Sequence, residues 1–131
     1  MDECHEWRYE TTFAAEPASV TRARAFVCRH LLEHRLWHLV DPVRVVASEL
    51  STNAASGVDT PFTLTLWASG SQVYVAVRDD GAQTLGSTEP GARRRLRLTI
   101  VALLSQECGE RPDGHGGCEV WASFAALPVP A

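Results

Sequence analysis

The sequence predicts an α+β fold, a two-layer α/β sandwich in which helices cover one face of a mainly antiparallel sheet. Four segments alternate apolar and polar residues with a period of two, which is typical of strands that bury one face. Three segments repeat apolar residues at helical spacing. Their order is strand, helix, helix, strand, strand, helix and strand, which favours a sheet layer packed on a helix layer. Alternation, rather than solid apolar runs, indicates antiparallel pairing.

The first half of the chain contains one predicted strand and two predicted helices. Residues 7–13 alternate and give the strand. The first helix covers about 17–34, where apolar residues recur at helical spacing. The second helix covers about 41–56 and begins at Asp41, an N-cap, followed by Pro42 at the first helical position.

The second half adds a hairpin, a loop and a third helix. The hairpin strands are 62–67 and 73–78, and the residues between them form a turn that contains glycine. Residues 80–92 are rich in Gly, Ser, Thr, Pro and Gln, so we expect a loop. The third helix is expected from Leu96 to about Glu107.

The chain closes with a turn, a strand and a tail. Residues 109–117 give the turn and residues 118–124 give the last strand. Residues 127–131 carry two prolines and are expected to fray. At 131 residues, the chain is long enough for one domain, which we place over 1–131.

Composition narrows the function. The chain has 12 basic residues, all of them arginine, so it lacks the lysine that P-loop proteins and ordinary protein kinases place on phosphates. A net charge of −4 gives no general attraction to nucleic acids or anionic membranes. No apolar run approaches the roughly 20 residues of a membrane span, and the acidic first residues lack the apolar core of a signal peptide. We therefore expect a cytoplasmic protein.

Cysteine and histidine offer only weak metal candidates. The four cysteines have no CxxC spacing and are expected to be free thiols in a reducing compartment. His30, His34 and His38 are spaced like a metal-binding helix face. No cysteine or carboxylate is well placed to complete the set, although Glu33 is nearby in the sequence, so we interpret them as surface or interface residues. Cys108 and Cys118, together with His115, form a second, looser cluster.

Two short motifs point to a nucleotide site. Glu49 and Asn53 are four residues apart and therefore share one face of the second helix. Asp79 and Gly81 follow an alternating apolar run, at a place where a carboxylate can bind the edge of a base. Together these motifs supply half of such a site.

Four segments carry a family resemblance, in the same order and at similar spacing. They are Val45–Ala54, Val75–Gly81, Leu98–Leu104 and Gly116–Ala122. The pattern resembles the GHKL, or histidine-kinase-like, ATPase superfamily over nearly the whole chain. Within that superfamily it is most similar to the small bacterial anti-sigma-factor serine kinases.

The resemblance implies a role for each matching residue. Asn53 corresponds to the asparagine that holds Mg²⁺ against the phosphates of ATP, and Glu49 corresponds to the general base that activates a serine hydroxyl or water. Asp79 corresponds to the carboxylate that accepts a hydrogen bond from the adenine amino group. Gly81 corresponds to a glycine that lets the backbone pass close to the base. ATP and Mg²⁺ are the implied cofactors.

The phosphate-binding segment departs from the family pattern. Arg95 and Arg97 stand where the family has two glycines that let backbone N–H groups approach the phosphates. Gln83 stands where a further glycine is expected. Three interpretations of the arginine run 93–97 stay open: a solvated run, a substitute clamp on phosphates, or a docking patch for an acidic partner.

The resemblance leaves two functions open. The chain is expected to be an anti-sigma-factor-like transcription regulator that binds a sigma factor, an anti-anti-sigma (STAS-type) protein, or both. It either transfers the γ-phosphate of ATP to a serine of that partner, or acts as a catalytically inactive interaction module of the same fold. We expect no direct nucleic-acid or membrane partner, and related proteins suggest a homodimer.

Overall fold

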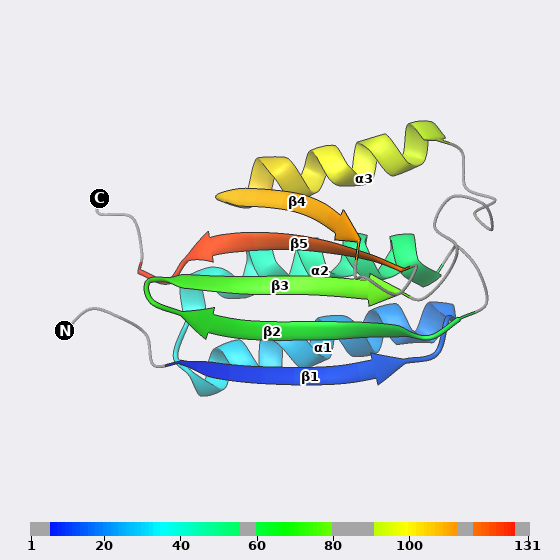
Figure 1. The fold of residues 1–131 in the computed structure, drawn as a ribbon. Coiled ribbons are helices and arrows are strands. Elements are labelled where there is room, and N and C mark those ends of the chain that lie inside the picture. The colour runs from blue at the N-terminus through cyan, green and yellow to red at the C-terminus, as the bar shows by residue number, and fades with distance from the viewer. Residues whose placement is uncertain (1–5, 56–59, 80–90, 113–116, 128–131) are drawn as a thin grey trace.

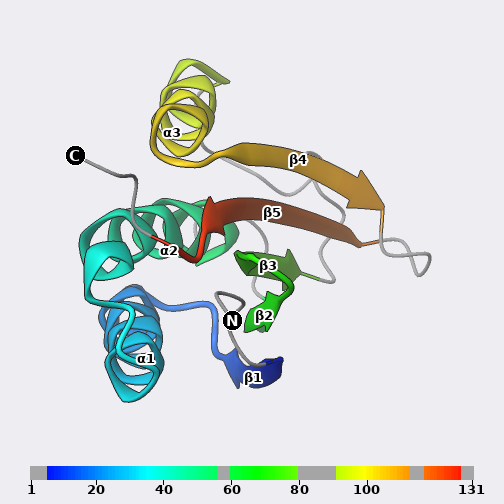
Figure 2. The ribbon, with the colours of Figure 1, turned by 90° about the vertical axis from the view of Figure 1, so that its left-hand side faces the viewer.

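The fold is α+β, with one five-stranded sheet and helices on one of its faces (Figures 1 and 2). The structure is a computed structural model that describes residues 6–55, 60–79, 91–112 and 117–127. The elements, in chain order, are β1 (Trp7–Phe13), α1 (Pro17–Glu33), the 3₁₀ helix η1 (Trp37–Leu39), α2 (Val40–Ala55), β2 (Phe62–Ser69), β3 (Gln72–Asp79), α3 (Gly91–Leu104), β4 (Glu107–Pro112) and β5 (Cys118–Ala125).

Every pairing in the sheet is antiparallel, as predicted, and the strand order is β1-β2-β3-β5-β4. The end-on view shows the strands as one layer and α1, α2 and α3 as a second layer beside it (Figure 2). The arrangement is compatible with the predicted two-layer sandwich. Within that helix layer α2 is central, because it packs against α1 on one side and α3 on the other.

The predicted hairpin is confirmed and its strands are longer than expected. Ser69 of β2 lies opposite Gln72 of β3, which leaves a two-residue loop of Gly70 and Ser71. Gly70 has φ of 59°, and a glycine at the first loop position is the mark of a type II′ turn. The turn matches the right-handed twist of the strands, so it fixes their register.

The core lies between the sheet and the helices. In β2, Phe62, Leu64 and Leu66 point to the helix side and are fully buried, as alternation requires. They meet side chains from α1 and α2 that recur at helical spacing. The fully buried members from these helices are Ala23, Val27, Leu31, Val43, Val46 and Ala47.

The beginning of α2 differs from the prediction. Asp41 was expected to be the N-cap, but η1 leads directly into α2, which starts at Val40. Asp41 therefore lies inside the first turn, where it accepts a 3.0 Å hydrogen bond from Arg44. A carboxylate in the first turn still faces the positive end of the helix dipole.

The region after the loop also differs. The third helix was expected over 96–107, whereas α3 runs from Gly91 to Leu104. Part of the predicted turn 109–117 belongs to a fifth strand, β4, which pairs with β5. Its sequence has no clean alternation, so its pairing depends on the backbone of β5 rather than on a local pattern. None of the helices in the described ranges is both long and apolar enough to cross a membrane.

Candidate functional site

The predicted site residues that the structure describes come from α2, β3 and α3, and α2 packs against both of the other elements. Glu49 and Asn53 lie in the C-terminal half of α2, and Asp79 is the last residue of β3. The C-terminal ends of α2 and β3 and the first turn of α3 lie toward the same end, on the right in Figure 1. Gly81, Gln83 and most of the predicted loop lie outside the described residues.

Helix α2 positions the acid and the amide by burying the residues around them. Leu50, Ser51 and Ala54 are buried, so the helix cannot rotate without exposing this face. Glu49 and Asn53 are half-buried and lie one turn apart, as the sequence predicted. Their spacing is therefore fixed by the helix rather than by a loop.

An arginine of α3 lies against the predicted base. The Nε atom of Arg97 is 3.7 Å from Oε2 of Glu49, and the two side chains are only 18% and 25% exposed. This separation is a charge contact rather than a short hydrogen bond. Because both groups are largely shielded from water, salt screens their attraction less than it screens a surface pair.

Arg97 reaches Glu49 because it lies on the buried face of α3. Val101, one turn further along α3, is almost fully buried, and α3 packs directly on α2. Arg95, two residues before Arg97, is exposed to solvent. A helix turns about 100° per residue, so the two arginines point to opposite sides although the sequence places both in the same segment.

The contact limits the chemistry available to Glu49. A general base has to accept a proton from a hydroxyl that lies within hydrogen-bond reach. In this arrangement, the guanidinium of Arg97 occupies one side of the carboxylate and balances its charge. A substrate hydroxyl would therefore compete with Arg97 for Glu49. The arginines that replace the two glycines already indicated an altered phosphate end, but the sequence did not show which arginine turns inward.

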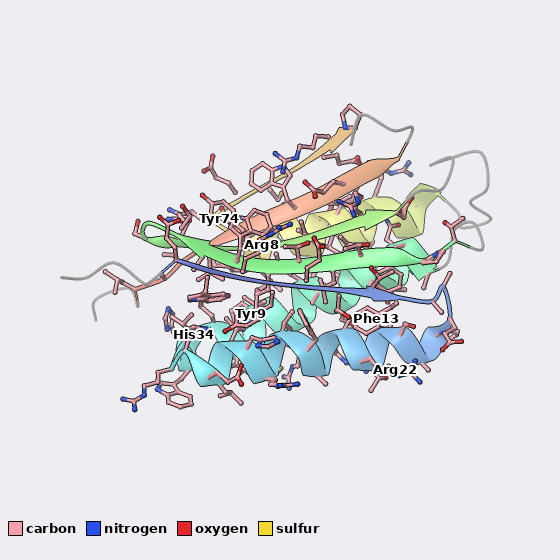
Figure 3. All side chains as sticks on the ribbon, turned by 60° about the horizontal axis from the view of Figure 1, so that its bottom comes forward. Arg8, Tyr9, Phe13, Arg22, His34 and Tyr74 are labelled. Carbon is pink, nitrogen blue, oxygen red and sulfur yellow. The ribbon has the colours of Figure 1, made fainter. Side chains whose placement is uncertain are left out.

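His30 of α1 and His34, which follows the end of α1, have a structural role, and the prediction of surface or interface residues is wrong for His30, which is buried. The Tyr9 hydroxyl lies 2.8 Å from Nε2 of His34, and the rings of Tyr9 and His30 stack with 3.7 Å between centroids. Trp7 stacks on His34, and Nδ1 of His30 lies 2.7 Å from a Glu33 carboxylate oxygen. Figure 3 shows Tyr9 and His34 between β1 and α1, so these rings hold the strand to the helix.

No metal site emerges in the described part of the chain. In the predicted histidine face, His30 and His34 are taken up by ring, hydroxyl and carboxylate contacts, and Nε2 of His38 lies 3.3 Å from the backbone oxygen of Ala125. No group of three potential ligands forms among the described residues. Cys108 lies opposite Ala122 and Cys118 lies opposite Pro112, so these two cysteines are four positions apart along the β4–β5 ladder. His115, the third member of the looser cluster, lies outside the described residues.

Among the cysteines, Cys28 and Cys108 are free thiols, as predicted, and their surroundings differ. Burial raises the pKa of the Cys28 thiol, while Arg44 opposes this shift and Asp41 adds to it. A raised pKa leaves less thiolate at neutral pH, so Cys28 is not an activated nucleophile. Cys108 lies exposed on β4.

Comparison of the sequence with models of known protein families gave no matching family, and comparison with curated proteins gave no similar sequence.

Proposed function

We propose that this protein is an anti-sigma-factor-like transcription regulator of the histidine-kinase-like fold that acts by binding protein partners and does not transfer phosphate. The partners implied by the resemblance are a sigma factor and an anti-anti-sigma protein of the STAS type. The observation that carries the proposal is the contact between Arg97 and Glu49. It places a cation on the predicted base, where the family resemblance calls for a carboxylate that is open to substrate.

The sequence and the fold support the part of this proposal that derives the chain from a nucleotide-binding, histidine-kinase-like ancestor. An acid and an amide one turn apart on α2, with a carboxylate at the end of β3, match the resemblance in residue type and order. The antiparallel sheet with helices on one face agrees with the architecture that the resemblance implies. In contrast, the segment that should approach phosphates through glycines carries arginine side chains.

A second candidate function is ATP-dependent serine phosphorylation of the partner. The position of Glu49 and Asn53 in the C-terminal half of α2, and of Asp79 at the end of β3, favours it, since these two elements end toward the same end of the molecule. In this function, the Arg97 guanidinium would leave Glu49 and bind the γ-phosphate, since planar guanidinium groups suit phosphate oxygens. Glu49 would then be free to act as the base, and Asn53 would hold Mg²⁺.

Calorimetric titration with Mg·ATP tests the proposal. We expect no binding, or binding too weak to saturate, because Arg95 and Arg97 replace the glycines that admit phosphates. Asn53→Ala is the informative variant, and Thr52→Ala, its neighbour on α2, is the matched control. Micromolar binding by the wild-type protein that Asn53→Ala abolishes and Thr52→Ala preserves would contradict the proposal.

A transfer assay then separates the two candidates. The protein is incubated with γ-labelled ATP, Mg²⁺ and an anti-anti-sigma protein encoded in the same genome. The proposal expects no labelled serine. Labelling that Glu49→Gln removes without loss of ATP binding would establish the kinase function instead.

A further inference from the structure

Helix α3 is apolar on its outer face although it already buries the opposite one. Val101 is almost fully buried, and Leu98 packs against the core. Leu96 and Leu103 lie on the other side, seven residues apart, and are 61% and 79% exposed. A surface helix normally presents polar residues to water, so a helix that is apolar on two sides indicates that a second surface covers the outer one.

The apolar side of α3 leads into a cleft at the C-terminal end of the helix. We call the exposed Leu96, Leu103 and Leu104 and the half-buried Ile100 the α3 stripe, since they follow one side of the helix. The cleft has a volume of about 340 Å³, and Leu104 belongs both to the α3 stripe and to the cleft wall. The rest of the wall is formed by His38, Leu39, Pro42, Ser105, Gln106, Phe124, Ala125 and Leu127. A concave, mostly apolar wall fits a protruding side chain.

The charges of α3 define the kind of partner. The helix contains four arginines between positions 93 and 97 and no carboxylate, and its first turn lacks the acidic residues that favour a helix N-terminus. Arg97 lies against Glu49, whereas Arg95 is exposed beside the α3 stripe. Carboxylates from a partner would therefore complement both the exposed arginine and the positive end of the helix dipole.

We propose that the α3 stripe and the adjoining cleft bind an acidic amphipathic helix of a partner protein. Apolar side chains of that helix cover Leu96 and Leu103, one of them enters the cleft, and its carboxylates face Arg95. A copy of α3 from a second molecule would bring arginines together without any carboxylate. An anionic membrane would match the charge and the leucines but would leave the cleft unfilled.

This inference rests on the proposed function, in which the protein acts by binding partner proteins, and adds the kind of partner that is bound. Its test uses no nucleotide, so the inference and the proposed function can fail separately. The probe is a fluorescent synthetic helix with Leu at heptad positions a and d, Glu at positions e and g, and Ala elsewhere. The control peptide has Lys in place of every Glu.

Fluorescence anisotropy measures the binding of both peptides to the full chain. We expect the Glu peptide to bind, its affinity to fall as salt is added, and the Lys peptide to bind about tenfold or more weakly. Leu103→Gln should lower the affinity for the Glu peptide by about tenfold or more, because the variant loses the burial of one leucine side chain. Arg95→Gln should remove most of the salt dependence of the affinity for the Glu peptide. Leu32→Gln on α1, where Leu32 is 44% exposed, is the matched control and should bind normally.

Several results would overturn this inference. The inference is wrong if the Glu and Lys peptides bind with equal affinity, if neither peptide binds, or if Leu103→Gln binds the Glu peptide as tightly as the wild-type protein does. Tighter binding to phosphatidylserine–phosphatidylcholine vesicles than to the Glu peptide would assign the surface to a membrane. A dimer in sedimentation that Leu103→Gln dissociates would assign it to a second copy. Circular dichroism checks that each variant is folded, and Leu96→Gln replaces Leu103→Gln if the latter is not.

Discussion

At the scale of single residues, the contact between Arg97 and Glu49 decides what the candidate site can do. Arg97 belongs to a run of arginines whose members could all have been solvated. Its position on the buried side of α3 brings its guanidinium to a carboxylate of α2 instead. A predicted catalytic base thereby becomes one half of an ion pair that links two helices.

A double-mutant cycle tests this pair by urea unfolding. Glu49→Gln and Arg97→Gln each remove one charge with little change in size, and we expect them to be coupled by about 1 kcal/mol in the free energy of unfolding. The physical reason is that the attraction between the two partly buried charges is lost when either one is removed, so the second substitution costs less than the first.

Arg95→Gln is the matched control for the cycle, because Arg95 lies on the same helix but is exposed. Its coupling with Glu49 should be near zero. If Arg97 shows no more coupling than Arg95, then Glu49 is open to a substrate in solution, and the binding-only function loses its main support.

At the scale of elements, the hairpin and β4 show two ways in which a strand is specified. The strands β2 and β3 carry alternating side chains and a glycine turn, so local sequence defines them. The strand β4 has little alternation and is held by pairing with β5. Gly109 of β4 faces Trp121 of β5 so closely that an added Cβ would lie 3.1 Å from the Trp121 ring. Glycine therefore makes room for that ring at this edge.

The turn of the hairpin gives a prediction at this scale. Gly70→Ala is expected to lower the free energy of unfolding by about 1 kcal/mol, because an alanine at φ of 59° meets the strain of left-handed backbone. No atom lies within 4 Å of the added methyl group, so the cost comes from the backbone alone.

Ser71→Ala, at the second loop position, is the control and should have little effect, since positive φ among non-glycine residues of the described chain occurs only at Arg35. Thermal and urea unfolding measure both variants. An unchanged Gly70→Ala protein would mean that the turn adopts another type in solution.

At the scale of the whole molecule, the leucines divide into those that build the core and those that face water. Leu64 is completely buried between the sheet and the helices, whereas Leu103 is 79% exposed. Hydrophobicity alone does not distinguish the two, because both side chains are leucine. The difference is their position: Leu64 lies between the sheet and the helices, whereas Leu103 lies on the outer side of α3.

This division can be measured. Leu64→Ala should lower the free energy of unfolding by about 2–5 kcal/mol, since it leaves a cavity in the core. Leu103→Ala should change it by no more than about 0.5 kcal/mol, because water already covers most of that side chain. Urea unfolding of the two variants compares them directly. A large loss of unfolding free energy in Leu103→Ala would show that Leu103 supports the fold, and it would remove the reason to expect a partner at this surface.

The sequence alone determined the elements whose signal is local. The period-two pattern of 7–13 and the hairpin, and the helical repeats of α1 and α2, follow from how successive side chains alternate or rotate. For the same reason, the spacing of Glu49 and Asn53 was predictable. The family resemblance suggested what these residues could do.

Only the tertiary structure decided the rest. It placed β5 between β3 and β4, turned Arg97 toward Glu49 and left Leu103 outside. Each of these depends on segments that are far apart in the chain. A strand such as β4 forms its hydrogen bonds with a neighbouring strand, and the buried side of α3 is the side that packs against α2. A one-dimensional pattern gives the faces of a helix, whereas packing decides which face meets the protein and which meets water.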